Sequence, residues 1–540
     1  MESRTTQFTL VGRLLAITAL ITLCCLMWLS AGQSAPSGQA AVSYPFPGRA
    51  EHLPSKHYWY MNHAHAAGIQ GKGYDIKTVR FDEDENQWTQ RKVGVTAEEY
   101  ADDPKNTDWS VYGQPVHAIA DGEVVRCWRN APENPAPGQS HPGRLSDPPT
   151  ISGGGNHIWV DHGNGEYALY AHFKPGTIPA NVCPINQEFI GDPDDPALPP
   201  GNRPKITKGQ MIGKVGNSGA SSNPHLHLHL QNSPPNEGNS SNAVELRFHN
   251  AWVKSTTKLE DDPADWERLQ GEAITTFPTA ILPDYSQGFA EIARHGVPAS
   301  EYQFTFDHIT KSGYRPVWVD GFEVGGKNYF NAIFRPADGT AWVARHGLTA
   351  AQYQDEFDLR TPQGYRPLQV ESYTDGAAIR YAVIFVKQAG PDWVAYHGKS
   401  ADQHQQTFNM LTAAGYRPIN NSVVAPGGER FYTSLYERKN VGSYIAKSFL
   451  TPGEYQDAFD ANKAAGRQLV YLNAYEYEGG VRFTAIWHSA VVGAYAARHG
   501  LTGAEYQDEW EHWTGLDYLT RCVTGYEAGS IAHFAALWRK

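Results

Sequence analysis

The C-terminal half of the chain repeats itself every 51 residues, and this repeat restricts the possible folds more than any other feature of the sequence. A unit this small cannot bury its apolar side chains alone, so neighbouring units must stack in a ring or in a solenoid. The repeat predicts five tandem units over residues 289–540. Three positions mark the units at steps of 51 residues: His295, His346, His397, Ser448 and His499; Tyr302, Tyr353, His404, Tyr455 and Tyr506; Phe334, Phe385, Tyr436, Trp487 and Trp538.

Each unit is predicted to hold one helix followed by two or three strands. The helix starts are N-cap residues with Gln or Glu three positions later, the pattern of a capping box, at Thr349, Ser400, Thr451 and Thr502. Pro298 breaks this pattern in the first unit. The helix ends are glycines suited to a left-handed backbone, at Gly313, Gly364, Gly415 and Gly466. We expect a closed propeller-like ring, because an opening strand at 289–295 can complete the sheet of the last unit.

The N-terminal half shows strands joined by tight turns. Residues 156–173 contain two β-rich runs joined by Gly163-Asn164-Gly165, which predicts a hairpin. Segments 113–125 and 206–216 are each predicted to form a strand, a tight turn and a second strand. The predicted fold class is therefore mainly β with some α: a domain built on an antiparallel β-sheet, followed by the five-unit repeat domain with one helix per unit.

The run Asn223-Pro224-His225-Leu226-His227-Leu228-His229 carries the strongest chemical signal in the chain. Successive side chains of a strand alternate between its faces, so His225, His227 and His229 project from one side and the leucines from the other. Grouped imidazole nitrogens are ligands that zinc prefers. The alternative is an ordinary amphipathic strand with histidines on its wet face.

These segments, in this order, resemble the lysostaphin and LytM family of zinc endopeptidases, which cut peptide bonds in bacterial cell-wall peptidoglycan. The resemblance covers roughly residues 60–250, and Pro224 to His227 match the family's Pro-His-Leu-His. The family continues with an aromatic residue and an acid, where this chain has Leu228 and His229.

The resemblance implies that two histidines and one aspartate hold zinc and leave the fourth position to the attacking water. His227 is then a zinc ligand. His225 and His172 are the catalytic histidines, which accept and donate protons because the pKa of imidazole lies near neutrality. His229 is expected to support the site or to face solvent rather than to bind metal.

The first half of the ligand set departs from the family pattern His-x-Gly-x-Asp. The corresponding stretch, Gly71-Lys72-Gly73-Tyr74-Asp75, keeps only the aspartate. We expect His65 to supply the missing ligand, with His63 as the second choice, because the glycines at 68, 71 and 73 allow the loop to bend back. If neither histidine does so, the zinc site is incomplete.

A serine nucleophile is a weaker interpretation of the run Gly216-Asn217-Ser218-Gly219. A serine hydrolase needs a general base and an orienting acid around Ser218, whereas the nearest histidines already belong to the metal pattern. The composition of the run is that of a turn.

The five units resemble the bacterial tandem repeat domain that accompanies polyglycine hydrolases, in which the repeats form a right-handed β-propeller. This resemblance covers residues 289–540. Arg-His-Gly recurs at 294, 345 and 498, and we interpret it as repeat architecture rather than as a metal or catalytic cluster.

The start of the chain predicts export. Arg4 and Arg13 precede an apolar run and small residues, which indicates a signal peptide at 1–32, although an uncleaved anchor remains open. A flexible lead-in is predicted at 33–50, the metallopeptidase domain at 51–270, and a linker at 271–288. Cys127 and Cys183 both lie in the enzyme domain and can form a disulfide outside the cell. Cys522, in the repeat domain, would then be an unpaired thiol.

The composition restricts the partners. A net charge of -12 argues against nucleic-acid binding and against electrostatic attraction to anionic wall polymers. The predicted function is a Zn²⁺-dependent endopeptidase, secreted or at the cell envelope and without a membrane span after signal cleavage, that acts on peptidoglycan or glycine-rich peptides. The repeats are predicted to position a partner or the substrate. The alternative is a catalytically inactive lysostaphin-like domain that serves as a binding or regulatory module at the envelope.

Overall fold

The computed structural model of the chain describes residues 42–53, 57–62, 64–65, 67–82, 85–189, 196–255 and 266–540. The predicted signal peptide, residues 1–32, lies outside these ranges. Within them, no helix is both long and apolar enough to cross a membrane.

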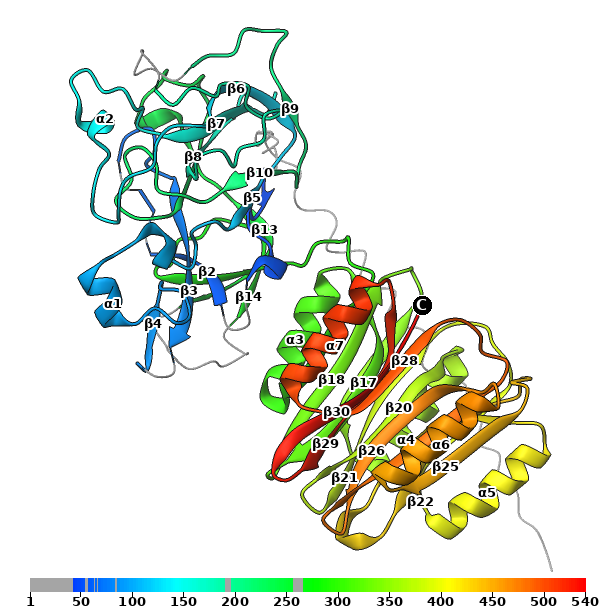
Figure 1. Cartoon of the computed structure of the whole chain (residues 1–540). Coiled ribbons are helices and arrows are strands. Elements are labelled where there is room, and N and C mark those ends of the chain that lie inside the picture. Colours follow the sequence, from blue (N-terminus) through cyan, green and yellow to red (C-terminus); the bar gives the residue numbers. More distant parts are fainter. Residues whose placement is uncertain are drawn as a thin grey trace, which may run out of the picture. The chain divides into compact units, whose positions relative to one another are not determined.

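One large sheet forms the N-terminal domain (Figure 1). Its main path runs β1-β13-β15-β2-β3-β11-β8-β7-β6-β9, with β4, β12 and β14 paired at the side. Every pair is antiparallel except β1 with β13. The strands are β1 (Tyr44–Pro45), β2 (His57–Met61), β3 (Tyr74–Asp82), β4 (Gln87–Thr89), β6 (Gly122–Trp128), β7 (Asn156–Asp161), β8 (Tyr167–Phe173), β9 (Lys205–Ile206), β11 (Leu226–Gln231), β12 (Ala243–Val244), β13 (Phe248–Ser255), β14 (Glu267–Glu272) and β15 (Thr279–Pro283).

Short elements complete this domain. A separate ribbon pairs β5 (Pro115–His117) with β10 (Met211–Lys214). Two short helices, α1 (Ala97–Asp102) and α2 (Pro142–Leu145), lie between the strands along the chain. The predicted hairpin at 156–173 is confirmed as β7 paired with β8.

The ends of this domain differ from the prediction. The flexible lead-in was expected to reach residue 50, but Tyr44 pairs with Phe248 in the sheet and Phe46 is buried in the core. The linker was expected at 271–288, but β15 lies between β13 and β2 inside the sheet. β1 and β15 are only two and five residues long, too short for a clear strand pattern in the sequence, and each pairs with strands that are distant in the sequence.

The alternation predicted for residues 225–229 divides β11 between two faces. Leu226, Leu228 and Leu230 are buried in the main core, and the histidines occupy the opposite face. A disulfide joins Cys127 to Cys183, which confirms the predicted pair. Cys522 is free and buried, and burial raises the pKa of its thiol to about 12.

The C-terminal domain consists of five units, each with a three-stranded antiparallel sheet and one helix. In each unit a first strand precedes the helix, and a hairpin of two long strands follows it (Figure 1). The units are β16 (Ile292–Pro298), α3 (Ala299–Lys311), β17 (Tyr314–Val324) and β18 (Lys327–Pro336); β19 (Trp342–Leu348), α4 (Ala350–Arg360), β20 (Arg366–Asp375) and β21 (Ala378–Val386); β22 (Trp393–Ser400), α5 (Ala401–Ala413), β23 (Arg417–Val424) and β24 (Phe431–Glu437); β25 (Tyr444–Leu450), α6 (Pro452–Ala464), β26 (Gln468–Tyr477) and β27 (Gly480–His488); β28 (Tyr495–Leu501), α7 (Gly503–Gly515), β29 (Leu519–Ala528) and β30 (Ile531–Arg539).

The helix boundaries follow the predicted signals. Capping boxes are present at the four predicted caps, and Pro298 forms no side-chain cap. The four predicted glycines after the helices all have a positive φ. In the fifth unit Asp517 takes the equivalent place with φ 64°, a conformation that aspartate tolerates better than most side chains.

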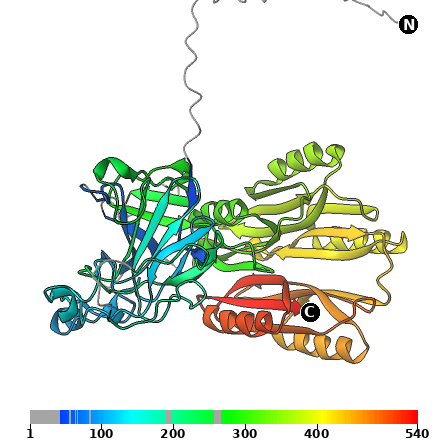
Figure 2. The same cartoon turned by 90° about the horizontal axis from the view of Figure 1, so that it is seen from above.

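One kind of contact joins four of the five pairs of neighbouring units, including the last unit and the first. On four of the five first strands a histidine packs on the tyrosine of the preceding helix, with ring centroids 4.8, 4.8, 5.2 and 4.6 Å apart in His346–Tyr302, His397–Tyr353, His499–Tyr455 and His295–Tyr506. On the first strand of unit four Ser448 replaces the histidine, and its Oγ lies 3.2 Å from the Tyr432 hydroxyl of unit three. Trp318 Nε1 of unit one also donates to the Val523 carbonyl of unit five at 2.8 Å. The five units therefore form a closed ring, with helices outside the strands (Figure 2).

The expected means of ring closure is wrong. The opening strand was expected to complete the last sheet, but β16 pairs with β18 of its own unit, and the last sheet has its own first strand, β28. The ring instead closes by side-chain packing between complete sheets. The physical reason is that the β17–β18 hairpin already presents an edge to β16 close by in the sequence.

Two carboxylates are buried where the inner strands of the ring meet. Asp320 Oδ2 accepts from Gly525 N and from Asn331 Nδ2, both at 2.8 Å. Glu371 Oε1 accepts from Ser422 Oγ at 2.6 Å. Burial raises the pKa of Asp320 to about 7, and burial together with Asp320 raises the pKa of Glu371 well above its usual range.

These groups predict that the ring is more stable in mild acid. Asp320 ionises near pH 4 when unfolded but only near pH 7 when folded, so the stability that Asp320 contributes falls as pH rises between these values and is constant outside them. The unfolding temperature of the full chain should be higher at pH 5.5 than at pH 8, on the order of a few degrees. Asp320→Asn should reduce this difference in differential scanning calorimetry. An unchanged difference would show that Asp320 is already ionised in the folded ring.

Candidate metal centre

Three neighbouring strands bring the candidate residues together. β11 lies between β3 and β8, and the register places His227 opposite Asp75 on one side and Ala171 on the other. His172 follows Ala171 directly, and His225 immediately precedes β11. The strand pairing therefore gathers four side chains that lie in three separate parts of the sequence.

A single carboxylate oxygen is the meeting point of three imidazoles. Asp75 Oδ1 lies 3.0 Å from His65 Nε2, 3.0 Å from His227 Nδ1 and 3.3 Å from His225 Nε2. Burial alone would raise the pKa of the Asp75 carboxyl, but the three imidazoles around it, those of His225, His227 and His65, lower this pKa.

A tight loop carries His65 to this position. The loop leaves at His65 and returns at Gly73, where His65 N donates to the Gly73 carbonyl at 2.9 Å, and Ala64 forms a bridge with Tyr74. Gly68 has φ 71°, which a turn of this kind requires. His63, the second choice from the sequence, lies outside the described residues.

The cluster offers the donor atoms of a zinc site. The ligand atoms of His65, Asp75 and His227 all lie within 4.8 Å of one another. Two tetrahedral nitrogen or oxygen ligands at about 2.0–2.1 Å from zinc are about 3.3 Å apart, close to the separations from Asp75 Oδ1. Two imidazoles and one carboxylate also suit the borderline character of the ion. The residues present fit Zn²⁺.

Two further histidines line the same cluster and are held by backbone carbonyls. His172 Nδ1 donates to the Ser218 carbonyl at 2.8 Å, and His225 Nδ1 donates to the Asn223 carbonyl at 2.7 Å. Their ring centroids are 4.7 Å apart. Because Nδ1 carries the proton in both neutral rings, Nε2 of His172 and Nε2 of His225 each keep an available lone pair. Burial, with the neighbouring histidines, lowers the pKa of His172 well below its usual value.

The backbone of His172 is unusual. Its φ of 67° lies in the left-handed region, which few residues other than glycine adopt. Such conformations persist only where the surrounding structure imposes them, and they are frequent at functional sites.

Ser218 has a structural part in the site. Its Oγ accepts from Asn156 N and donates to the Phe173 carbonyl, both at 2.9 Å, and the side chain is fully buried. Its hydroxyl is therefore committed to the backbone. The weak serine-nucleophile interpretation finds no support, while the Ser218 carbonyl orients His172.

His229 and Gln231 extend the row of polar side chains on β11. Of the two alternatives expected for His229, facing solvent is excluded, because the residue is 2% exposed and its Nδ1 lies 2.9 Å from His227 Nε2. Gln231 was not among the predicted residues. Its place in the alternation, two residues after His229, was a signal that could have identified it.

The two domains of the chain are similar to different known proteins. The repeat units match the family model of the polyglycine hydrolase-like structural repeat at residues 290–337, 339–388, 390–439, 443–490 and 492–540, which confirms the predicted repeats. A search of curated proteins finds no match.

The N-terminal region aligns with solved peptidase structures. The catalytic domain of the antimicrobial peptidase lysostaphin from Staphylococcus simulans is 22% identical, with 26% of this chain and 78% of that chain covered and a TM-score of 0.14. A zinc-containing peptidase from Vibrio cholerae is 14% identical, with 32% and 48% covered and a TM-score of 0.14. A putative M23 peptidase from Pseudomonas aeruginosa is 16% identical, with 38% and 51% covered and a TM-score of 0.16.

Proposed function

We propose that the N-terminal domain is a zinc-dependent endopeptidase that hydrolyses peptide bonds in cell-wall peptidoglycan or in glycine-rich peptides. The observation that carries this proposal is the convergence of His65 Nε2, Asp75 Oδ1 and His227 Nδ1 beside two other histidines with available Nε2 atoms. The sequence resemblance of Pro224 to His227 to the lysostaphin and LytM family supports the same chemistry. An exported location agrees with such a substrate and is part of the proposal.

The roles of the residues follow from their contacts. His65, Asp75 and His227 would hold the metal. Zn²⁺ bound there would polarise the scissile carbonyl and lower the pKa of a bound water to about 7. His172 and His225 accept a proton from the water and return one to the leaving amine through Nε2, because each Nδ1 proton is committed to a carbonyl.

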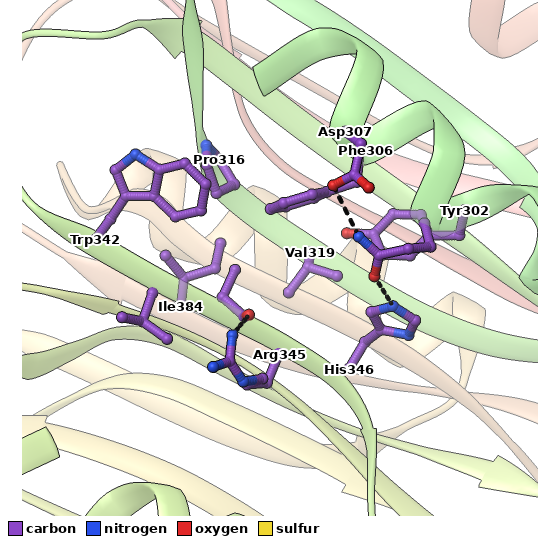
Figure 3. A pocket seen from close by; sticks show the side chains of 12 residues that line it. Tyr302, Phe306, Asp307, Pro316, Val319, Trp342, Arg345, His346 and Ile384 are labelled. Atoms are coloured by element: carbon purple, nitrogen blue, oxygen red, sulfur yellow. Dashed lines mark hydrogen bonds between the residues drawn. The ribbon is translucent and has the colours of Figure 1, made fainter. Parts of the chain in front are cut away.

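We further propose that the ring positions a partner or the substrate and has no catalysis of its own. A hollow of about 360 Å³ lies where α3 meets β19, with Tyr302, Phe306 and Trp342 around it (Figure 3). Its polar groups bond to one another: Gln303 donates to Asp307 at 2.9 Å and lies 3.1 Å from His346 Nε2. The hydrogen bond between Gln303 and Asp307 has an equivalent on the helix of each of the other four units, so it belongs to the architecture of the repeat. These equivalents are Gln354–Asp358, Gln405–Asn409, Gln456–Asp460 and Gln507–Glu511.

The test is metal-dependent peptide cleavage by the full chain. Purified protein should contain one zinc per chain and release amines from oligoglycine peptides or from wall preparations. A chelator should abolish this release, and added zinc should restore it. Protein that holds no zinc and releases no amines from either substrate would favour the inactive binding module instead.

A further inference from the structure

Three side chains on one face of β11 form a continuous chain of hydrogen-bonding atoms that leads away from the metal centre. His227 Nε2 lies 2.9 Å from His229 Nδ1, and His229 Nε2 lies 3.4 Å from Gln231 Oε1. Gln231 is 1% exposed. A chain of buried donors and acceptors must place each proton so that every contact pairs a donor with an acceptor.

The far end of this chain sets the direction of its hydrogen bonds. The Gln231 amide nitrogen donates to the Ser233 carbonyl at 2.8 Å and to the Pro234 carbonyl at 2.9 Å. Because carbonyls only accept, the amide orientation is settled and Gln231 Oε1 faces His229 as an acceptor. His229 therefore carries its proton on Nε2, and its Nδ1 is a lone pair that accepts the proton of His227 Nε2.

The position of the His229 ring is also fixed by packing. The Trp159 ring meets it edge to face, with centroids 5.2 Å apart. Gly73, at the end of the loop that carries His65, passes so close that a Cβ there would lie 2.7 Å from His229 Cβ. The His229 side chain thus lies between Trp159 of β7 and the loop that carries His65.

We propose that His229 is a positioning residue of the metal centre, which accepts the hydrogen bond of His227 Nε2 as a neutral imidazole and so turns the Nδ1 lone pair of His227 towards Asp75. This proposal rests on the proposed function in one respect, the binding of zinc at this cluster. Partners of this kind fix the tautomer and orientation of a ligating histidine, and their loss typically weakens metal binding about 10–100-fold.

Two substitutions of His229 separate the hydrogen bond from packing. Asparagine can place its Oδ1 near the position of the imidazole Nδ1, whereas leucine fills similar space without an acceptor. In the full chain, His229→Leu should weaken zinc affinity about 10–100-fold in a chelator competition, and His229→Asn should stay within a few-fold of the wild type. Equal losses in both variants, or no loss in His229→Leu, would overturn the proposal.

A second measurement needs neither catalysis nor zinc. Nitrogen-15 chemical shifts of the histidines in the full chain, assigned by comparison with His229→Asn, should show His229 protonated on Nε2 and bare on Nδ1, with or without zinc. A proton on Nδ1 would overturn the proposal even if the leucine variant fails to fold. A wild-type chain that binds zinc but cleaves no peptide would refute the endopeptidase and leave the zinc comparison of the two variants decisive.

Discussion

Replacing His172 by alanine is expected to lower kcat by about 10²–10⁴-fold while one zinc per chain remains bound. His225→Ala should do the same, because both side chains are tied to backbone carbonyls through Nδ1 and direct only Nε2 towards the cluster. Replacing Asp75 or His227 is expected to remove the zinc itself, since their atoms face each other at 3.0 Å in the proposed ligand set. Metal analysis and steady-state kinetics on the same preparations separate the two classes.

His65 is the decisive residue in this comparison. If its contact with Asp75 reflects metal binding, His65→Ala should lose zinc together with activity. His249→Ala serves as the matched control and should retain both, because His249 lies on β13 and, among the described residues, its side chain hydrogen-bonds to Ser43. Retention of stoichiometric zinc and full rate by His65→Ala would show that another residue completes the centre, with His63 the first to be tested.

Removing the disulfide is expected to lower the free energy of unfolding of the N-terminal domain by about 4 kcal/mol. The bond joins cysteines 56 residues apart, and its loss frees a long loop in the unfolded chain. Urea unfolding of the double variant Cys127→Ala, Cys183→Ala should show the loss as a lower midpoint with a similar slope.

A reductant supplies the control for this prediction. It should lower the midpoint of the wild type to that of the double variant and leave the double variant unchanged, because Cys522 is already a free thiol. A wild-type midpoint that does not respond to reductant under unfolding conditions would contradict the assigned role of the disulfide.

Features that depend on local backbone geometry could be predicted from the sequence. The alternation of residues 225–229 placed the histidines on one face of β11, because side chains of any strand alternate. The caps at Thr349 and its equivalents located the helices, since a capping box needs only residues three positions apart. The 51-residue period likewise required five stacked units, whatever their exact packing.

The partners of these elements were decided by the tertiary structure. His65 reaches Asp75 because a loop closes on β3, and His172 reaches His225 because β8 happens to be the strand beside β11. The ring closes through contacts such as Trp318 with Val523, and not through the opening strand. The sequence by itself determined the faces, the caps and the repeat, because each follows from the geometry of a few neighbouring residues. Only the tertiary structure decided which strands pair and which distant side chains meet, because that choice depends on how the apolar surfaces of the whole domain are buried together.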